Sequence, residues 1–347
     1  MEDTYAKFIH DAQNSVGSDY AKSVLESYRQ YDGDTGGLVR SIADIFQNSF
    51  LNIDFAADWI GPAVCILLLF LLFHMVQNLL KSRAAVGAVQ YFLNMALAVT
   101  VAAPVYELMS RACMYMNDVT LFFGVLAPVM GVMTASGGNV AAAGAGSVFL
   151  TIFLAAAQFL IDRLVPAVCA AFTGLAMMSV VSGDVSMLQF SKWLRNTLFG
   201  VLSVCITLLF IVIGCQNLAV TSTDTLTAKT LRLLVSNAVP VVGGTIGDAI
   251  RFAGGGLVTI KNATGMASVV FLLAVFLPVL VMLWAAGFIL SVLIHICDYF
   301  SMVLPRAFFG NLKCAFDFSI AGFSAIFVMA VVNIGIFLSG VPALVMS

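Results

Sequence analysis

Few side chains in this sequence could carry out chemistry, and only one pair of residues could form a catalytic couple. A serine hydrolase needs a serine within hydrogen-bond reach of a histidine base. Ser324, in the run Gly-Phe-Ser-Ala, and His295 are the two residues that could be assigned these roles. Small residues of this kind are also the ordinary packing residues of membrane helices. We therefore expect packing rather than catalysis at Ser324.

Asp248 is the candidate for a second kind of enzyme, an intramembrane aspartyl protease. Such a site needs two facing carboxylates, and Asp248 has no obvious partner in the sequence. Its local order, Thr-Ile-Gly-Asp, also departs from the usual Gly-x-Gly-Asp pattern. The three glycines at 254–256 are followed by leucine rather than by Lys-Ser/Thr, so they do not form a phosphate-binding loop. We predict that the protein is not an enzyme, that it binds no cofactor, and that any energy from ATP comes from a partner.

The cysteines and most charges offer no metal site and no ion relay. The seven cysteines lie mostly within apolar runs, with no CxxC pair and no His/Cys cluster at metal-ligand spacing, which is typical of buried packing residues. Charged residues stand at the ends of the apolar blocks, and His74, His295 and Glu107 are the main exceptions. Coupled transporters usually place ionisable groups at mid-membrane. A small-solute transporter is therefore the alternative function rather than the favoured one.

The composition identifies an integral membrane protein. Of 347 residues, 61% are hydrophobic and 10% are charged, whereas a soluble domain carries roughly 25% charged residues. The net charge of -2 and the absence of any Lys/Arg-rich run exclude nucleic acid as a partner. Lipid is the expected surrounding medium.

Residues 1–58 form a polar N-terminal arm with ten acidic and four basic residues. Apolar residues recur at helical spacing in its second half, which predicts an amphipathic helix there: Leu38, Ile42, Ile45, Phe46 and Phe50. A secretory signal is not visible, because the stretch lacks an apolar core behind a basic start.

Residues 59–347 are predicted to form an all-α membrane domain. Residues 60–80 contain 21 uncharged positions, enough for a helix that crosses a hydrocarbon layer of roughly 30 Å. Further apolar blocks run over 86–109, 121–134, 141–161, 164–182, 197–219, 264–297 and 318–346. We predict seven or eight spans. The block at 264–297 is longer than a bilayer needs, so we expect a kink at Pro278, where a backbone hydrogen bond is lost, or a steep tilt.

Basic residues in short loops predict the orientation. With eight spans, one face of the membrane carries Lys81, Arg83, Lys192, Arg195, Arg306 and Lys313. The acidic arm then lies on the other face, outside the cytoplasm.

The segment 220–263 is too polar to span as one simple helix. Its stretch from Asn237 to Gly256 contains six glycines, Pro240 and the pair Asp248 and Arg251. We expect two amphipathic pieces broken at Pro240 and at Gly243-Gly244, where a bent backbone is easily adopted. Irregular backbone at membrane depth must be buried in protein or line a wet cavity. An interfacial connector and a re-entrant, pore-facing hairpin both fit this pattern.

This segment resembles the stage III sporulation protein AE family. The resemblance lies in Asn237-Ala-Val-Pro240-Val-Val-Gly243-Gly244, then Asp248, then Ile-Lys261-Asn262-Ala-Thr-Gly265, and then the apolar helix that carries Pro278. It extends from about Leu121 to the C-terminus, and the N-terminal arm does not contribute to it.

The resemblance implies a multispanning subunit of the mother-cell membrane that surrounds the forespore of an endospore-forming bacterium. Its family belongs to a secretion-like channel complex, the feeding tube, with the other proteins of the stage III sporulation A operon and the forespore protein Q of stage II. The expected structural and assembly residues are Asn237, Pro240, Gly243, Gly244 and Asp248 at the bend, Lys261, Asn262 and Gly265 where the chain re-enters the next span, and Pro278 within that span.

Overall fold

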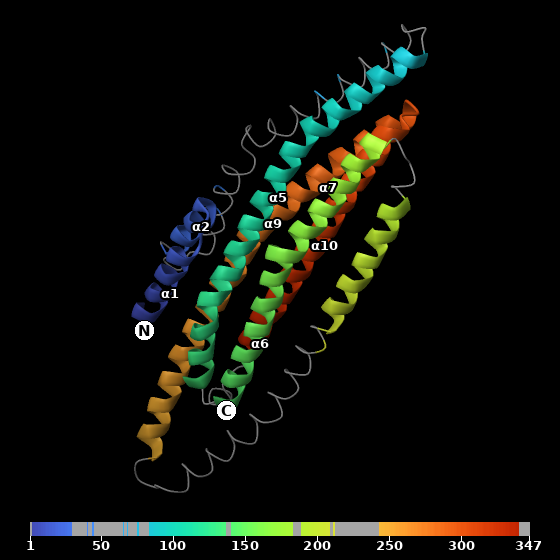
Figure 1. Ribbon diagram of the computed structural model, residues 1–347. Coiled ribbons are helices and arrows are strands. Elements are labelled where there is room, and N and C mark those ends of the chain that lie inside the picture. The colour runs from blue at the N-terminus through green and yellow to red at the C-terminus, as the bar shows by residue number, and fades with distance from the viewer. Residues whose placement is uncertain are drawn as a thin grey trace.

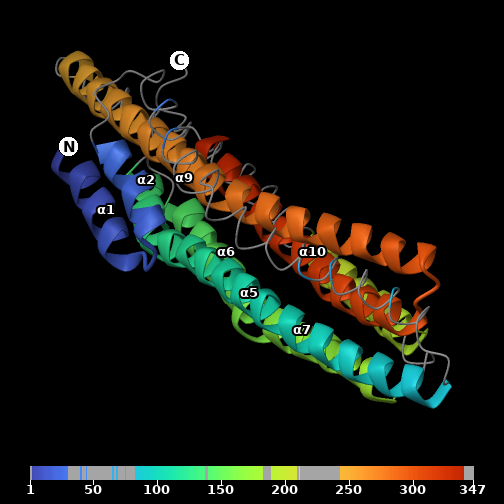
Figure 2. The same cartoon turned by 90° about the horizontal axis from the view of Figure 1, so that it is seen from above.

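The chain folds into long, nearly parallel helices, as Figures 1 and 2 show. The computed structural model describes residues 2–29, 83–136, 140–182, 189–208 and 243–339, together with Arg40, Asp44, Cys65, Leu68, Met75 and Ile211. These residues are helical apart from short connections, and no strand occurs among them. The predicted all-α class is therefore confirmed.

Helix α5, Arg83–Ser136, merges two of the predicted blocks into one helix of 54 residues. A separate span at 121–134 is therefore not confirmed, because one candidate span runs from Ala98 to Val132. The polar residues between the two blocks do not end the helix, because they have partners on or beside it: Arg111 pairs with Glu107 one turn earlier. Asp118 binds another part of the chain, as described below. Pro104 and Pro128 are both accommodated inside α5.

A second merger joins α6, Val140–Phe159, to α7, Val165–Ser182, through the π-helical segment η1, Leu160–Leu164. The Asp162-Arg163 doublet, expected to separate two spans, lies inside η1. Pro166 explains the wide turn, because it has no N–H to donate four residues back. The preceding N–H, of Val165, instead bonds to the carbonyl of Leu160, five residues back. Such a π turn lets a membrane helix continue through a proline.

Helices α9, Gly243–Tyr299, and α10, Val303–Ser339, are joined by a tight turn. Ser301 has a φ of 56°. The N–H of Met302 bonds to the carbonyl of Cys297 at 2.8 Å, and that of Ser301 to the carbonyl of Asp298 at 3.1 Å. This pair of bonds is the Schellman arrangement that ends many helices. It makes α9 and α10 antiparallel neighbours.

Four helical stretches in the described part of the chain are long and apolar enough to cross a membrane: Ala98–Val132, Leu150–Val180, Ala267–Tyr299 and Val303–Gly335. The expected seven or eight spans are not confirmed. Mergers within α5 and within α6–α7 account for part of the difference, and the block at 60–80 lies outside the described residues except for Cys65, Leu68 and Met75. At 1.5 Å per residue, α5 and α9 are each about 80 Å long, far more than the roughly 30 Å hydrocarbon layer requires.

Aromatic side chains hold the bundle together along its axis. Phe122 of α5 stacks on Phe271 of α9 at a centroid distance of 4.1 Å. Phe276 of α9 stacks on Phe327 of α10 at 4.4 Å. Each pair adds a directional contact of about 1 kcal/mol to the burial of its rings. Helix α9 thus lies between α5 and α10.

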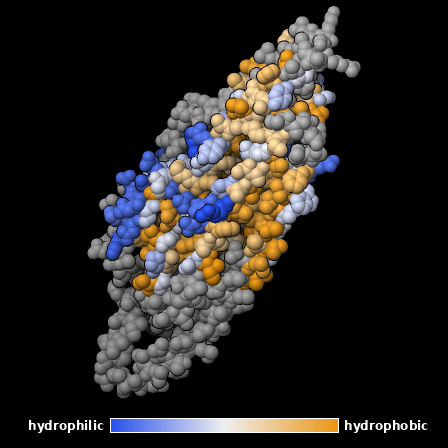
Figure 3. Space-filling view, viewed as in Figure 1, coloured by the Kyte–Doolittle hydropathy of each residue, from blue (hydrophilic) through white to orange (hydrophobic). Residues whose placement is uncertain are grey.

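Helices α1, Glu2–Ser15, and α2, Asp19–Arg29, form a hairpin against the side of α5 and α9 (Figure 1). One face of this hairpin is buried: Phe8, Ile9, Ala12, Val16, Tyr20, Ala21, Val24 and Leu25. These apolar residues recur at helical spacing and meet the bundle, while polar residues cover the outer face, visible as the blue region at the side of the molecule in Figure 3. The amphipathic helix expected at 38–50 lies outside the described residues, except for Arg40 and Asp44.

Candidate functional site

The predicted assembly residues fall on one continuous helix as far as the structure describes them. The backbone at Gly243, Gly244, Asp248, Lys261, Asn262, Gly265 and Pro278 belongs to α9. Asn237 and Pro240 lie outside the described residues. We expected the chain to re-enter the membrane at 261–265, and a kink at Pro278 or a steep tilt in the span that follows; α9 continues as one helix through both places. A glycine-rich helical extension therefore leads directly into the apolar span.

This extension has 24 residues before the span that begins at Ala267, a length of about 36 Å. Figure 1 shows the end of α9 reaching beyond the end of α5. The side chains of Asp248, Lys261 and Asn262 are outside the described part of the chain, whereas Gly265 is buried where the extension meets the bundle. Gly243 and Gly244 thus stand at the start of a projecting helix, and the other glycines of this stretch lie within it.

The apolar half of α9 carries a stripe of large exposed hydrophobic side chains. Its members recur at three- or four-residue intervals and face away from the bundle: Leu273, Leu277, Val281, Trp284, Phe288 and Val292. Trp284 is 66% exposed and Phe288 is 70% exposed. The stripe covers 19 residue steps, about 28 Å, which matches the hydrocarbon thickness of a bilayer. It defines the lipid-facing side of α9.

Charged residues gather near the C-terminal end of this stripe. Asp298 and Arg306 pair across the α9–α10 turn at 2.7 Å. Arg195 pairs with Asp317 of α10 at 3.1 Å, and its guanidinium lies 5.4 Å from the centre of the Phe199 ring. These ion pairs tie three helices together in the half of the bundle nearer the α9–α10 turn.

Several charges lie inside long helices: Glu107 was expected as an exception, whereas Arg111, Asp162 and Arg163 were expected at the ends of apolar blocks. Glu107 and Arg111 form an ion pair on an exposed face of α5, within a candidate span. Asp162 and Arg163 sit in the π segment. A charge within a membrane helix is costly unless it is paired or reaches a polar phase. Because the predicted blocks are joined into continuous helices, charges that we had placed in loops between them lie inside those helices.

Asp118 of α5 is the polar residue that sequence reasoning missed. Its side chain is buried, at 1% exposure. One carboxylate oxygen accepts the N–H of Gly17 at 2.8 Å, and the other accepts the N–H of Ser18 at 3.1 Å. These donors immediately precede α2, so Asp118 satisfies backbone groups at the N-terminus of that helix from another element. In the sequence, Asp118 lies between the apolar blocks at 86–109 and 121–134, and no local pattern indicated its partner.

Tyr20 makes a second polar contact between the hairpin and the bundle. Its hydroxyl donates to the carbonyl of Ala274 in α9 at 2.8 Å, and its ring meets Tyr115 of α5 edge to face. Burial raises the pKa of the Tyr20 phenol well above its ordinary value of 10.0, and the neighbouring Tyr115 raises the pKa further. The hairpin thus contacts both α5 and α9 through buried polar groups.

The structure does not pair the two residues considered for nucleophilic catalysis. Gly287 of α9 faces Ile320 of α10. His295 lies eight residues from Gly287 toward the α9–α10 turn, and Ser324 lies four residues from Ile320 away from that turn. The two residues are therefore about 18 Å apart along the helix axis. Among the residues that the structure describes, no group of three metal-binding side chains occurs. The six described cysteines are free.

The fold and the lipid-facing stripe define a polytopic α-helical membrane protein. A model of the family described as stage III sporulation protein AE matches residues 27–301. The chain belongs to this family of sporulation proteins.

Comparison with individual proteins agrees with this assignment. The chain is 21% identical over 216 residues to the stage III sporulation protein AE of Bacillus subtilis (strain 168). The match covers 62% of this chain and 54% of that relative, so the chain spans about half the length of the curated relative. No solved structure matches the chain.

Proposed function

We propose that this protein is a membrane subunit of a secretion-like channel, the feeding tube, between mother cell and forespore, and that it is needed for spore development. It resides in the mother-cell membrane that surrounds the forespore. Its partners are the other proteins of the stage III sporulation A operon and, through the complex, the forespore protein Q of stage II. Family membership supports the sporulation role, and one feature of α9 supports assembly.

That feature is the glycine-rich extension of α9. Gly243, Gly244 and four further glycines follow one another within the first fourteen residues of the helix. Glycines lower helix propensity by about 1 kcal/mol each relative to alanine, so they are a poor choice for an isolated solvated helix. They do allow another helix to approach closely. A projecting helix with this composition is suited to contact a partner subunit.

The test is to replace Gly243 or Gly244 in the full chain and to purify the complex from sporulating cells. Gly243→Val and Gly244→Val add branched side chains and are expected to abolish co-purification with the partner proteins. Gly243→Ala and Gly244→Ala are the matched controls, because alanine favours the helix and still permits close packing. Normal recovery of the complex with both valine variants would refute the assembly role.

A solute transporter is the competing function, since Gly/Pro-interrupted helices also form substrate sites. Purified protein in liposomes separates the two functions. We expect no saturable, gradient-driven uptake of a solute. Uptake that is lost in Asp248→Asn would favour transport over the channel subunit.

The orientation of the arm stays a prediction. A cysteine placed on the exposed face of α1, for example at Lys7, is expected to react with a membrane-impermeant thiol reagent from the non-cytoplasmic side. Labelling only after permeabilisation would mean that the arm lies on the cytoplasmic side, opposite to the prediction.

A further inference from the structure

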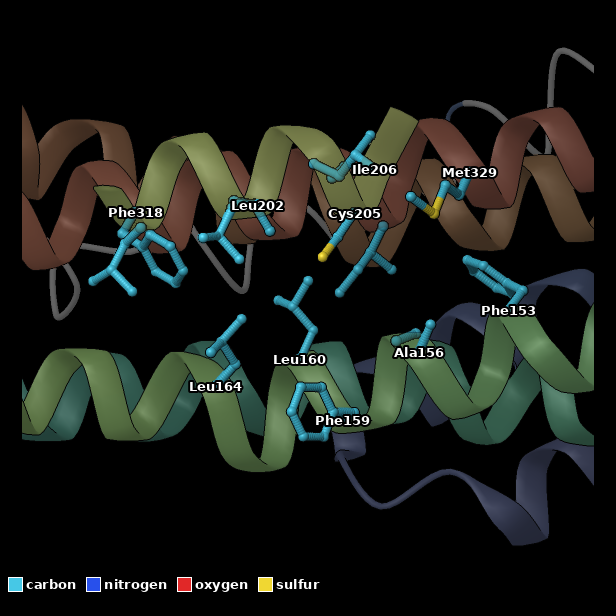
Figure 4. A pocket seen from close by; sticks show the side chains of 15 residues that line it. Phe153, Ala156, Phe159, Leu160, Leu164, Leu202, Cys205, Ile206, Phe318 and Met329 are labelled. Carbon is cyan, nitrogen blue, oxygen red and sulfur yellow. The ribbon is translucent and has the colours of Figure 1, made fainter. Parts of the chain in front are cut away.

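An apolar cavity of about 230 Å³ lies between three parts of the bundle (Figure 4). One wall is formed by α6 and η1, the second is the helix of residues 189–208, and the third is α10. Leu160 points into the cavity from the π segment, and Cys205 faces it from the opposite wall. Neither the ion pairs nor the arm contact described above involves this space.

The π segment and small side chains create the cavity together. Leu160 opens the π turn and packs over Gly322 of α10, where a Cβ would lie 2.9 Å from the Leu160 Cδ2 atom. At this point the two walls touch. Ala156 and Ala325, about one turn away on their helices, leave the space that larger residues would fill. π turns often occur at functional sites in membrane and soluble helices.

The lining restricts what can occupy the cavity. Its side chains are aliphatic or aromatic apart from the sulfur atoms of Cys205 and Met329, and none carries nitrogen or oxygen. A polar ligand would lose its hydrogen bonds to water here without replacement, at a cost of several kcal/mol. Water itself would lack the two to four polar partners that it needs. The occupant must be apolar.

The cavity also opens toward lipid. Phe159 and Val201 belong to its rim and are 60% and 57% exposed. Val204 and Leu208 continue the exposed apolar face of the 189–208 helix beside it. Leu160 and Leu164 lie within the candidate span Leu150–Val180. The medium around the opening is therefore hydrocarbon, and an acyl chain can enter sideways.

The dimensions and the charge at one end of the cavity narrow the ligand to a phospholipid. The wall from Phe153 to Leu164 covers eleven residue steps, about 16 Å, which accommodates a long segment of an extended chain. Beyond the end marked by Leu198 and Phe318, three cations and one anion gather: Lys192, Arg195, Lys313 and Asp317.

Arg195 and Asp317 pair with each other, and this leaves an excess of positive charge from the two lysines. Phe190 and Trp193 stack at the same level, as aromatic residues do at a membrane interface. A lipid phosphate would meet Lys192 when its chain fills the cavity.

We propose that this cavity binds one acyl chain of an anionic membrane phospholipid, with the phosphate near Lys192. The bound chain fills the gap between the α6–η1 wall and α10 and holds the 189–208 helix against them. This inference is independent of the channel function, because it rests on the cavity and its charged rim.

The full protein, reconstituted with phosphatidylglycerol that carries a photoreactive diazirine in its acyl chain, provides the test. Irradiation and peptide mapping should place adducts on the peptides around Leu160 and Cys205, above the level found on the lipid-facing stripe of α9. Ala325→Phe fills the cavity and should reduce those adducts to the stripe level. Val328→Phe, on the exposed face of the same helix, is the matched control and should leave them unchanged.

Two further variants and a comparison of two lipids complete the test. Ala156→Phe fills the cavity from the opposite wall and replaces Ala325→Phe if that variant loses its helical circular dichroism. Lys192→Gln should lower labelling by phosphatidylglycerol to the level obtained with phosphatidylcholine. Labelling that persists in both filled variants, or equal labelling by the two lipids in the unmodified protein, overturns the proposal. Adducts in the isolated protein that vanish in the intact complex would show that a partner helix occupies the cavity instead.

Discussion

The carboxylate of Asp118 accepts the backbone N–H of Gly17 at 2.8 Å, although the two residues are 101 positions apart. The same carboxylate also accepts the N–H of Ser18, so one buried side chain holds the turn between α1 and α2 against α5. A charged acceptor that satisfies two backbone donors anchors the hairpin more firmly than apolar contact alone, because the donors have no other partner once water is excluded.

Replacing this anchor should release the hairpin. Asp118→Ala removes both hydrogen bonds and is expected to weaken docking by about 2 kcal/mol, since hydrogen bonds to charged groups contribute more than neutral ones. Limited proteolysis should then cut within residues 2–29 faster than in the unmodified protein. Glu107→Gln, in the exposed ion pair on the same helix, is the control and should change little. Equal protection of the hairpin in Asp118→Ala would contradict the anchoring role.

Docking of the hairpin should also depend on alkaline pH through Tyr20. The pKa of the phenol is raised in the folded state, so its contribution to stability is complete below the ordinary pKa of 10.0 and is lost as the pH rises through the higher, folded value. Tyrosinate absorbance and protease sensitivity should therefore rise together as the pH passes through the folded-state pKa of Tyr20.

In Tyr20→Phe this alkaline step should disappear, and loss of the bond to Ala274 should cost about 1 kcal/mol. A protease sensitivity that rises at the same alkaline pH with and without the hydroxyl would rule out Tyr20 as the responsible group.

Ser301, in the α9–α10 turn, is a position at which a substitution should raise the stability of the protein. Ser301 adopts a φ of 56°, a left-handed conformation that costs a residue with a Cβ roughly 1 kcal/mol. Ser301→Gly should raise the thermal unfolding temperature of the detergent-solubilised protein, and Ser301→Val should lower it. The opposite order would mean that the Ser301 side chain stabilises the turn by more than the strain it causes.

Asn311 of α10 carries a buried amide whose oxygen and nitrogen have no hydrogen-bond partner among the described residues. An unsatisfied buried polar group costs about 1–3 kcal/mol. Asn311→Leu, which is close in size and apolar, should therefore stabilise the protein against thermal unfolding. Asn333→Leu is the comparison, because the Asn333 amide donates to the carbonyl of Met329 at 2.9 Å and its loss should not be stabilising. Destabilisation by Asn311→Leu would show that the amide has a partner in the assembled protein.

The sequence predicted the helical membrane class of the protein better than it predicted where each helix begins and ends. The helical membrane class follows from composition and from uncharged runs such as Thr264 to Cys297, because lipid leaves the backbone no partner but its own helix. Block boundaries were less predictable. Pairs of charges such as Glu107 with Arg111 and Asp162 with Arg163 resemble loop ends in the sequence, yet the helices continue through them.

The sequence by itself therefore determined the membrane class, the family and the positions of the apolar stretches, since these depend on local composition and spacing. Only the tertiary structure decided that Asp118 meets Gly17, that Arg195 meets Asp317, and that a cavity opens beside Leu160. Each of these joins residues far apart in the chain, and their meeting depends on how the helices cross and pack, which no local pattern encodes.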